Sequence, residues 1–295
     1  MAYLLLTLTT LFWAGNFVLA RAFSVDIPPI TLALIRWSLA FVILLPFAIP
    51  AIYKHRDVIR QYWPRLILFG ALSVAGFNTL AYIGLQTTTA MNGTLMQSSM
   101  PIMILCISTV VLRESTTVRQ WLGVLLSLLG VLALISKGDP EALMSLNFNR
   151  GDLWVLLAMF VWACYSLALR WKPREMSGFA FFSVSLTVGV IILVPLSLLE
   201  TERALQIHWD MDLILLISYL AIFPSILAYL FWNYGVEKLG AHKAGLFIHQ
   251  VPMWGIILSV IFLAEQVQAF HLWGIALIFT GIYLAVVAGT VTGKS

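Results

Sequence analysis

The segment that decides the fold is GLQTTTAMNGTLMQSSMPIMILCISTVVLRESTTVRQWLGVLLSLLG, which runs from Gly84 to Gly130. A gapless shift of 151 residues aligns it with the segment from Gly235 to Gly281. The residues that both copies share are, in the first copy, Gly84, Ala90, Leu95, Pro101, Ser108, Leu112, Glu114, Gly123, Leu126 and Gly130. Leucines would coincide by chance in so apolar a chain, but a proline, a glutamate and three glycines in register would not. The chain is therefore an internal duplication.

The composition identifies the class of protein. Of 295 residues, 61% are hydrophobic and 10% are charged, against roughly 25% charged residues in soluble domains. The mean hydropathy of +0.96 is too high for a soluble core of this size and indicates a polytopic membrane protein. The two cysteines, Cys106 and Cys164, lie in apolar segments and provide neither a disulfide framework nor metal-ligand spacing. We therefore expect no cofactor.

Ten apolar runs come close to the roughly 20 residues that a spanning helix needs. They cover residues 3–20, 30–52, 64–86, 93–112, 119–137, 151–170, 177–199, 211–235, 241–263 and 270–291. We predict an all-α integral membrane protein of ten transmembrane helices, arranged as a five-helix repeat over residues 1–140 and a second over residues 141–295.

The distribution of basic residues predicts the orientation of these helices. One side of the membrane, which holds both termini, carries twelve of the seventeen Lys and Arg residues, the other side carries four, and Arg36 lies within a span. The positive-inside rule then places both termini in the cytoplasm of a bacterial-type inner membrane. Because five is an odd number, the second repeat enters the membrane from the opposite side. Such inverted repeats are typical of alternating access, with the substrate held between the halves near the midplane.

The repeated pattern also carries a family resemblance. Gly84, Ala90, Pro101, Glu114, Gly123 and Gly130, together with their second copy, resemble the paired EamA-like domains of the drug/metabolite transporter superfamily. The resemblance implies a ten-helix carrier that moves amino acids, related metabolites or drugs, usually outward, and the chain is similar to the YddG-type exporters of aromatic amino acids and metabolites. One departure is Arg36, which aligns with Ser185 in the second copy, so the two halves cannot offer identical groups to a substrate.

Polar residues in the middle of the helices predict the substrate site, because polar side chains in hydrocarbon are costly and face the interior. They fall on equivalent helices of both repeats, with tryptophans close by in sequence. We expect a neutral, hydrogen-bonding cavity with aromatic walls for amphipathic organic solutes. The candidate substrate-binding residues are Trp13, Asn16, Arg36, Asn78, Tyr82, Gln97, Ser99, Trp162, Tyr165, Tyr229, Asn233, His249 and Gln250. Each polar residue taken alone has an alternative role as a hydrogen bond between helices.

Two candidates have competing roles. Arg36 lies in the outer part of its helix, where it either extends to the membrane surface or holds a substrate carboxylate. His249 in mid-helix is either a proton-coupling group or an uncharged hydrogen-bonding partner.

Prolines, acids and glycines of the repeated pattern suggest structural roles. Pro101 and Pro252 should bend their helices and act as gating hinges. Glu114 and Glu265 stand before a turn, where a carboxylate can cap the next helix. The glycines of the last helix in each repeat should allow close packing or form a dimer face. The protein is then a monomer or a homodimer.

Enzymatic and nucleotide-driven functions have little support. The sequence has no His-Glu-x-x-His motif and no nucleophile with an obvious base. The tail over residues 289–295, GTVTGKS, is one residue too short for a phosphate-binding loop and no helix follows it. There is no ATP-binding domain and no soluble basic face for nucleic acid. We expect a secondary transporter that exports amino acids, especially aromatic or neutral ones, and related small metabolites. Its rivals are a drug or organic-cation carrier of the same build, a membrane-embedded enzyme on lipid-like substrates and a non-transporting scaffold.

Overall fold

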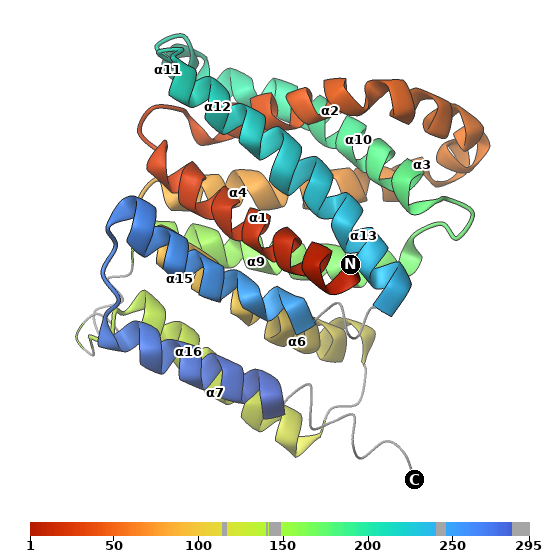
Figure 1. The fold of residues 1–295 in the computed structure, drawn as a ribbon. Coiled ribbons are helices and arrows are strands. Elements are labelled where there is room, and N and C mark those ends of the chain that lie inside the picture. Colours follow the sequence, from red (N-terminus) through yellow and green to blue (C-terminus); the bar gives the residue numbers. More distant parts are fainter. Residues whose placement is uncertain (114–116, 140, 142–148, 240–245, 285–295) are drawn as a thin grey trace.

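The computed structural model describes residues 1–113, 117–139, 141, 149–239 and 246–284, and its regular secondary structure is helical throughout these ranges (Figure 1). Glu114, the start of the expected helix at 241 and the tail over residues 289–295 lie outside the described residues. The boundary expected between residues 140 and 141 falls beside undescribed residues and stays a prediction.

The helices of the first half are α1 (Ala2–Ala22), α2 (Pro29–Lys54), α3 (Arg56–Gly70), α4 (Phe77–Leu85), α5 (Ala90–Met96), α6 (Met100–Leu112) and α7 (Val118–Ile135). Those of the second half are α9 (Arg150–Ala168), α10 (Gly178–Ser197), α11 (Thr201–Ala204), α12 (Met211–Leu220), α13 (Ala228–Leu239), α15 (Gln250–Leu263) and α16 (Ala269–Ile282). Several begin at a side-chain cap, as where the Thr89 hydroxyl accepts the Asn92 N–H before α5 and the Ser177 hydroxyl accepts the Ala180 N–H before α10.

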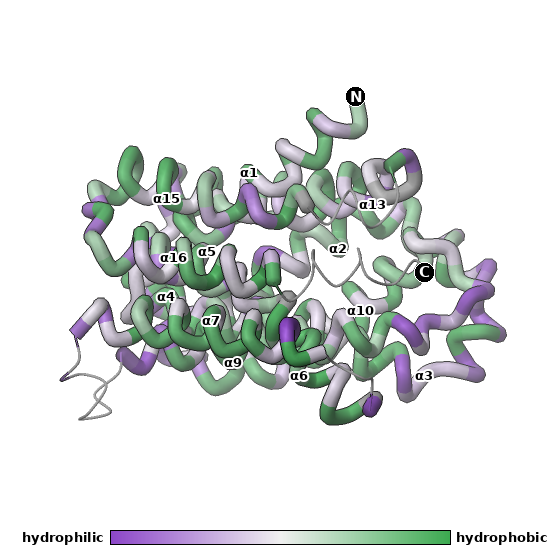
Figure 2. Tube along the Cα trace, turned by 90° about the horizontal axis from the view of Figure 1, so that it is seen from below, coloured by the Kyte–Doolittle hydropathy of each residue, from purple (hydrophilic) through white to green (hydrophobic). Residues whose placement is uncertain are grey.

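Seven helical segments of the described chain are long and apolar enough to cross a membrane. They are Ala2–Ala22, Pro29–Lys54, Arg56–Leu85, Val118–Ile135, Arg150–Trp171, Gly178–Ala204 and Met211–Gly235. The pair Ala90–Ser99 and Ile102–Val111, bent by 41°, makes an eighth if it is one span, and Phe247–Leu263 and Ala269–Ile282 are shorter apolar helices. Hydrophilic residues gather at helix ends and connections, and apolar ones along the helices (Figure 2). The all-helical membrane fold is confirmed at this level, and the count of ten inverted spans stays a prediction.

Corresponding irregularities interrupt helices of the two halves. A π-helical turn, η1 (Ala71–Gly76), joins α3 to α4, and another, η5 (Ala221–Leu227), joins α12 to α13. Likewise a 3₁₀ turn, η2 (Gln97–Ser99), precedes α6, and η6 (Leu246–His249) precedes α15. Pro101 and Pro252 therefore lie in the first turn of a new α-helix, directly after a change of helix type. The bend predicted in the first copy is present at this point.

Glycines bring α7 and α16 into contact at one edge of the bundle (Figure 1). A Cβ atom built on Gly130 would lie 2.7 Å from the carbonyl oxygen of Gly274 and 2.7 Å from a side-chain carbon of Ile278. A Cβ on Gly274 would lie 2.7 Å from Leu134. Because such distances exclude any side chain, the repeated glycines serve close packing of these two helices within the chain.

Candidate functional site

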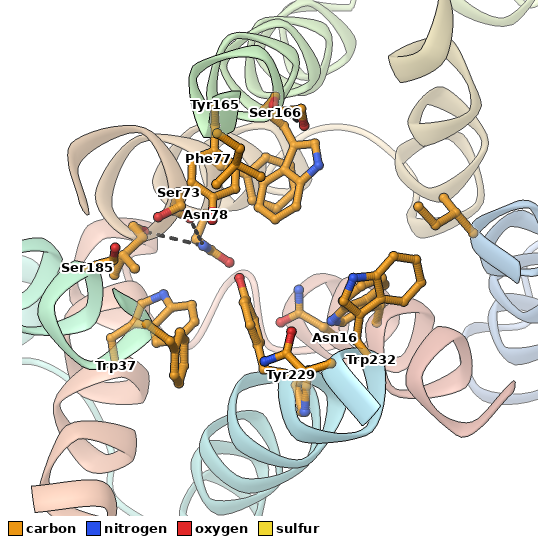
Figure 3. A pocket seen from close by; sticks show the side chains of 18 of the residues that line it. Asn16, Trp37, Ser73, Phe77, Asn78, Tyr165, Ser166, Ser185, Tyr229 and Trp232 are labelled. Atoms are coloured by element: carbon orange, nitrogen blue, oxygen red, sulfur yellow. Dashed lines mark hydrogen bonds between the residues drawn. The ribbon is translucent and has the colours of Figure 1, made fainter. Parts of the chain in front are cut away.

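A cavity of about 440 Å³ lies between α1, α2, α4, α9, α10 and α13 (Figure 3). This volume falls in the range of roughly 300–1,000 Å³ that is usual for small-molecule sites. Both halves of the chain contribute to its wall, which includes the two π-helical turns through Ser73 and Pro224. Figure 3 shows Asn16, Trp37, Asn78, Tyr165, Tyr229 and Trp232 around the central space.

Arg36 is the most constrained polar residue of this wall. Its side chain is buried, with 3% of the residue's surface exposed, so it does not extend to the membrane surface. Its Nη1 donates to the side-chain oxygens of Asn16 at 2.9 Å and Asn78 at 3.0 Å, and to the hydroxyl of Tyr82. Its Nε donates to the hydroxyl of Ser225 at 2.7 Å. The snorkelling alternative is thus wrong.

The π-helical turns explain how a helix backbone helps to hold this cation. A π turn changes the backbone pairing of its helix and leaves a carbonyl for other donors. The Leu220 carbonyl, at the start of η5, accepts from the Ser225 hydroxyl at 2.7 Å and from Arg36 Nε at 3.2 Å. In the first half the Phe69 carbonyl, before η1, accepts from the Ser73 hydroxyl at 2.6 Å. In each half, therefore, a serine hydroxyl donates to the carbonyl that precedes the π turn. In the second half, Arg36 donates to the same carbonyl.

The guanidinium has no counter-ion among the described residues. The side chains that accept from Arg36 are all neutral: Asn16, Asn78, Tyr82 and Ser225. The ion pair seen among the described residues joins Arg56 to Asp57 at the surface and does not involve Arg36. Nη2 of Arg36 makes no hydrogen bond to a described residue, although Arg36 lines the cavity. A buried cation that neutral dipoles alone solvate retains a strong attraction for an anion. Its two free N–H groups are available to such a ligand.

Aromatic rings form much of the remaining wall. Trp13 and Trp232 lie with ring centroids 5.4 Å apart, and Phe77 and Trp162 4.7 Å apart. Tyr229 stacks on Phe182 at 4.6 Å. These pairs give the cavity apolar faces on which a flat or branched apolar group can pack.

The charge of the wall is positive. Arg36 and Lys172 are its charged residues, and none of the described lining residues is acidic. Lys172 lies in the connection between α9 and α10, with its ammonium 5.2 Å from the ring centroid of Phe181. Partial burial lowers the pKa of Lys172 because desolvation disfavours the charged form.

The cavity reaches the α9–α10 connection but not the opposite end of the bundle. At that end, side chains form hydrogen bonds to the backbone of the segment between α4 and α5. Arg21 Nη1 donates to the carbonyls of Leu85 and Gln86, each at 2.9 Å. Glu265 accepts the backbone N–H of Ala90 at 2.8 Å and of Met91 at 2.9 Å. Glu265 therefore caps α5 of the other half, and the prediction that it caps the helix following it, α16, is wrong. This end is closed.

The comparisons with known proteins agree with this architecture. Residues 1–136 and 149–287 match the EamA-like transporter family. The chain belongs to this family. It is thus a membrane transporter of the drug/metabolite transporter superfamily with paired EamA domains, as the repeated motif predicted.

Three relatives of this EamA-like transporter have names that state no substrate. The chain is 26% identical over 283 residues to the uncharacterized transporter YyaM of Bacillus subtilis, covering 96% of this chain and 92% of YyaM. It is 25% identical to an uncharacterized transporter of Archaeoglobus fulgidus, covering 96% of each chain. A WAT1-related chloroplastic protein of Arabidopsis thaliana is 25% identical over 92% of this chain and 66% of its own length. A solved crystal structure matches with a TM-score of 0.64 at 19% identity and 99% coverage of both chains, which supports the fold alone.

The structure brings most of the predicted site residues of this transporter together. Those that line the cavity are Trp13, Asn16, Arg36, Asn78, Gln97, Trp162, Tyr165, Tyr229 and Asn233. Tyr82 lies behind the wall and binds Arg36. Three others lie elsewhere: Ser99 donates to the Met96 carbonyl, Gln250 accepts from Thr10, and His249 packs 5.6 Å from the Phe279 ring. Substrate contact by any of them stays a prediction.

Several lining residues of the transporter were not predicted from its sequence. Trp37, Ser73, Phe77, Lys172 and Phe182 line the cavity. Aromatic residues are common in every apolar segment, so Phe77 and Phe182 carry no distinguishing signal. The sequence does contain a distinguishing signal for Trp37, because this tryptophan directly follows Arg36. The guanidinium carbon lies 4.6 Å from the Trp37 ring centroid.

Proposed function

We propose that this EamA-like transporter carries amino acids with aromatic or other apolar side chains, and related carboxylate-bearing metabolites, outward across the inner membrane. The observation that carries the proposal is Arg36, a buried guanidinium without a counter-ion in an aromatic-walled cavity. A substrate carboxylate would receive the two Nη2 N–H groups. The ammonium group of the amino acid would face ring surfaces and neutral oxygens.

The transport cycle we propose is alternating access between two inverted five-helix repeats. The matching positions of η1 with η5 and of η2 with η6 support the repeat, and the seven long helices, the bent pair and the two shorter helices account for the ten expected spans. With both termini in the cytoplasm, the α9–α10 connection is cytoplasmic. The cavity then opens inward, and the end closed by Arg21 and Glu265 is the external one.

The charge of the wall argues against the rival reading as an organic-cation carrier. A cation would approach Arg36 and Lys172 with no described carboxylate along the wall to offset them. Like charges in a low-dielectric site repel strongly. A carboxylate gains from both residues.

Counterflow in proteoliposomes tests the proposal. Vesicles loaded with unlabelled phenylalanine or leucine should accumulate the labelled amino acid, and vesicles loaded with choline should not accumulate labelled choline. The variant R36A should lower counterflow about ten- to hundredfold, because a hydrogen bond to a charged group is worth about 1.5–3 kcal/mol. Absence of counterflow for every amino acid with intact protein would refute the function, and unchanged counterflow in R36A would refute the carboxylate site.

A further inference from the structure

Hydrogen-bond donors and acceptors are unequal in the cavity wall, and Arg36 is the cause. A guanidinium donates and never accepts, so each polar group beside it must turn an oxygen toward it. Asn16, Asn78, Tyr82 and Ser225 all do so. The side-chain oxygens next to Arg36 are therefore occupied by the protein itself.

Asn16 is held in one orientation by these bonds. Its Oδ1 accepts from Arg36 Nη1 at 2.9 Å and from the Tyr82 hydroxyl at 2.7 Å. A flipped amide would place its nitrogen against the guanidinium, donor against donor. Nδ2 makes no hydrogen bond to a described residue, and Asn16 lines the cavity. Its two N–H groups are thus available to a ligand.

Two more donors without an acceptor belong to the neighbours of this amide. Nη2 of Arg36 makes no hydrogen bond to a described residue, and the indole N–H of Trp37, a residue that is 1% exposed, has no partner either. Arg36 and Trp37 both line the cavity, and the guanidinium carbon lies 4.6 Å from the Trp37 ring centroid. Three side chains of one region therefore carry N–H groups that no described oxygen accepts.

The side-chain acceptors that remain free among the described lining residues are neutral. Asn78 is fully occupied, because its amide nitrogen donates to the Ser73 and Val74 carbonyls. The hydroxyls of Tyr165 and Tyr229 make no hydrogen bond to a described residue, and Figure 3 shows the Tyr229 hydroxyl at the central space. A hydroxyl can donate as readily as it accepts. The wall thus combines fixed donors with uncharged acceptors.

The α-ammonium group of an amino acid fits this wall poorly. It has three donors and no acceptor, and it would enter beside the Arg36 cation with no described carboxylate along the wall to offset it. Like charges repel strongly where the dielectric constant is low. An ammonium group also loses its hydration on leaving water. A neutral oxygen on the same carbon avoids both penalties and can accept from the free donors.

We infer that the preferred substrates are α-keto and α-hydroxy acids with apolar side chains rather than the corresponding amino acids, and this inference rests on the carboxylate site of the proposed function. The carboxylate binds the Nη2 N–H groups of Arg36, and the oxygen on the α-carbon accepts from Nδ2 of Asn16. These donors are adjacent, because Nη1 of the same guanidinium bonds Oδ1 of the same amide. The apolar side chain packs on the aromatic wall.

Competition in proteoliposomes tests this preference with compounds of one carbon skeleton. Counterflow of labelled leucine into vesicles loaded with leucine is measured against external leucine, α-ketoisocaproate, isocaproate and isoamylamine. The keto acid should halve the signal at a concentration about tenfold lower than leucine does, because it exchanges a repelled ammonium for an accepted oxygen. Isocaproate, which lacks a group on the α-carbon, should lie between the two, and isoamylamine should not compete.

Two variants test the cause of the preference. N16D keeps an oxygen for Arg36 and replaces the free N–H groups by a second, charged oxygen, so the ratio of the two half-inhibiting concentrations should fall from about ten to about one or below. N233D adds a carboxylate elsewhere on the wall and should lower the ratio as well. Q61E, at an exposed position of α3 outside the cavity, should keep the ratio of the wild type. A ratio cancels any loss of carboxylate binding that both compounds share.

The outcomes separate this inference from the proposed function. Leucine competing as well as the keto acid, or an unchanged ratio in both N16D and N233D with intact protein, would overturn the inference and leave amino-acid transport standing. Where no amino acid shows counterflow, labelled α-ketoisocaproate takes its place. Counterflow of that keto acid alone would support the inference and refute amino-acid transport, and counterflow of neither compound would refute both.

Discussion

Nη1 of Arg36 lies 3.0 Å from Oδ1 of Asn78, and the amide nitrogen of the same Asn78 donates to the Ser73 carbonyl at 3.0 Å. The asparagine thus bridges a cation of α2 to the backbone of η1. In the second copy a tyrosine, Tyr229, occupies the position of Asn78, and Asn233 that of Tyr82, so the two residue types exchange places between the halves. A neutral oxygen beside Arg36 leaves the positive charge for the substrate.

Replacing Asn78 by aspartate should give Arg36 a permanent counter-ion. In N78D the carboxylate would occupy the guanidinium, so we expect counterflow of carboxylate-bearing solutes to fall more than about tenfold. The melting temperature should change much less than transport does. Q61E is the control for an added carboxylate, because Gln61 is exposed on α3 and does not line the cavity. Equal loss in both variants would contradict the assignment.

Removing the side chain of Glu265 should loosen the closed end. E265A leaves the N–H groups of Ala90 and Met91 without their acceptor, which costs about 0.5–2 kcal/mol for a lost cap. E265Q keeps an acceptor oxygen and should retain part of this stability. Melting temperatures would rank the proteins as wild type, E265Q, then E265A. A melting temperature of E265A equal to that of the wild type would show that this cap does not stabilise the closed end.

A methyl group on Gly130 should separate α7 from α16. G130A places its Cβ 2.7 Å from the Gly274 carbonyl oxygen, and overpacking of this kind costs about 1–3 kcal/mol. The control is G178A, since no atom lies within 4 Å of a Cβ at Gly178. Thermal unfolding in detergent should show a loss for the first variant and no loss for the second. Equal melting temperatures would mean that these helices are not in contact.

The lowered pKa of Lys172 predicts a pH dependence of substrate capture. Its charge is lost at a lower pH than that of an ordinary lysine, so the apparent KM for carboxylate-bearing solutes should rise from about pH 8 to about pH 10. K172Q should show a KM about two- to fivefold higher and no such rise, because one partly solvated charge is worth roughly 0.5–1 kcal/mol. K172R should keep a low KM throughout. A wild-type profile in K172Q would exclude this residue.

The helices and much of the cavity wall follow from rules that act locally. Long apolar runs must form helices in hydrocarbon, so every described helix of membrane length falls on an expected run. Polar residues in mid-membrane must face inward, which identified Asn16, Arg36 and Asn78. The sequence suggested that Arg36 could bind a carboxylate, but it did not predict the residues that position its side chain. Ser225 and Leu220 accept from Arg36 and lie far away in sequence, so no spacing between residues indicates these contacts.

The residues that prediction missed depend on helix rotation and on partners from other helices. His249 and Gln250 precede Pro252 in the same way as Gln97 and Ser99 precede Pro101. Of these four described residues, Gln97 lines the cavity and the other three do not. Tertiary packing sets that rotation. The π turns have no sequence signature of their own.

The cap that Glu265 places on α5 has a consequence for the synthesis of the chain. Side chains of each half bond to helix backbone groups of the other half. Glu200 of the second half accepts the Thr31 N–H of the first half at 2.8 Å, and Ser127 of the first half donates to the Ile278 carbonyl of the second half at 3.2 Å. A half produced alone would leave the first-turn N–H groups of α2 and α5 without these carboxylate acceptors. During synthesis the helix ends of the first half therefore gain these partners only after the second half has been made.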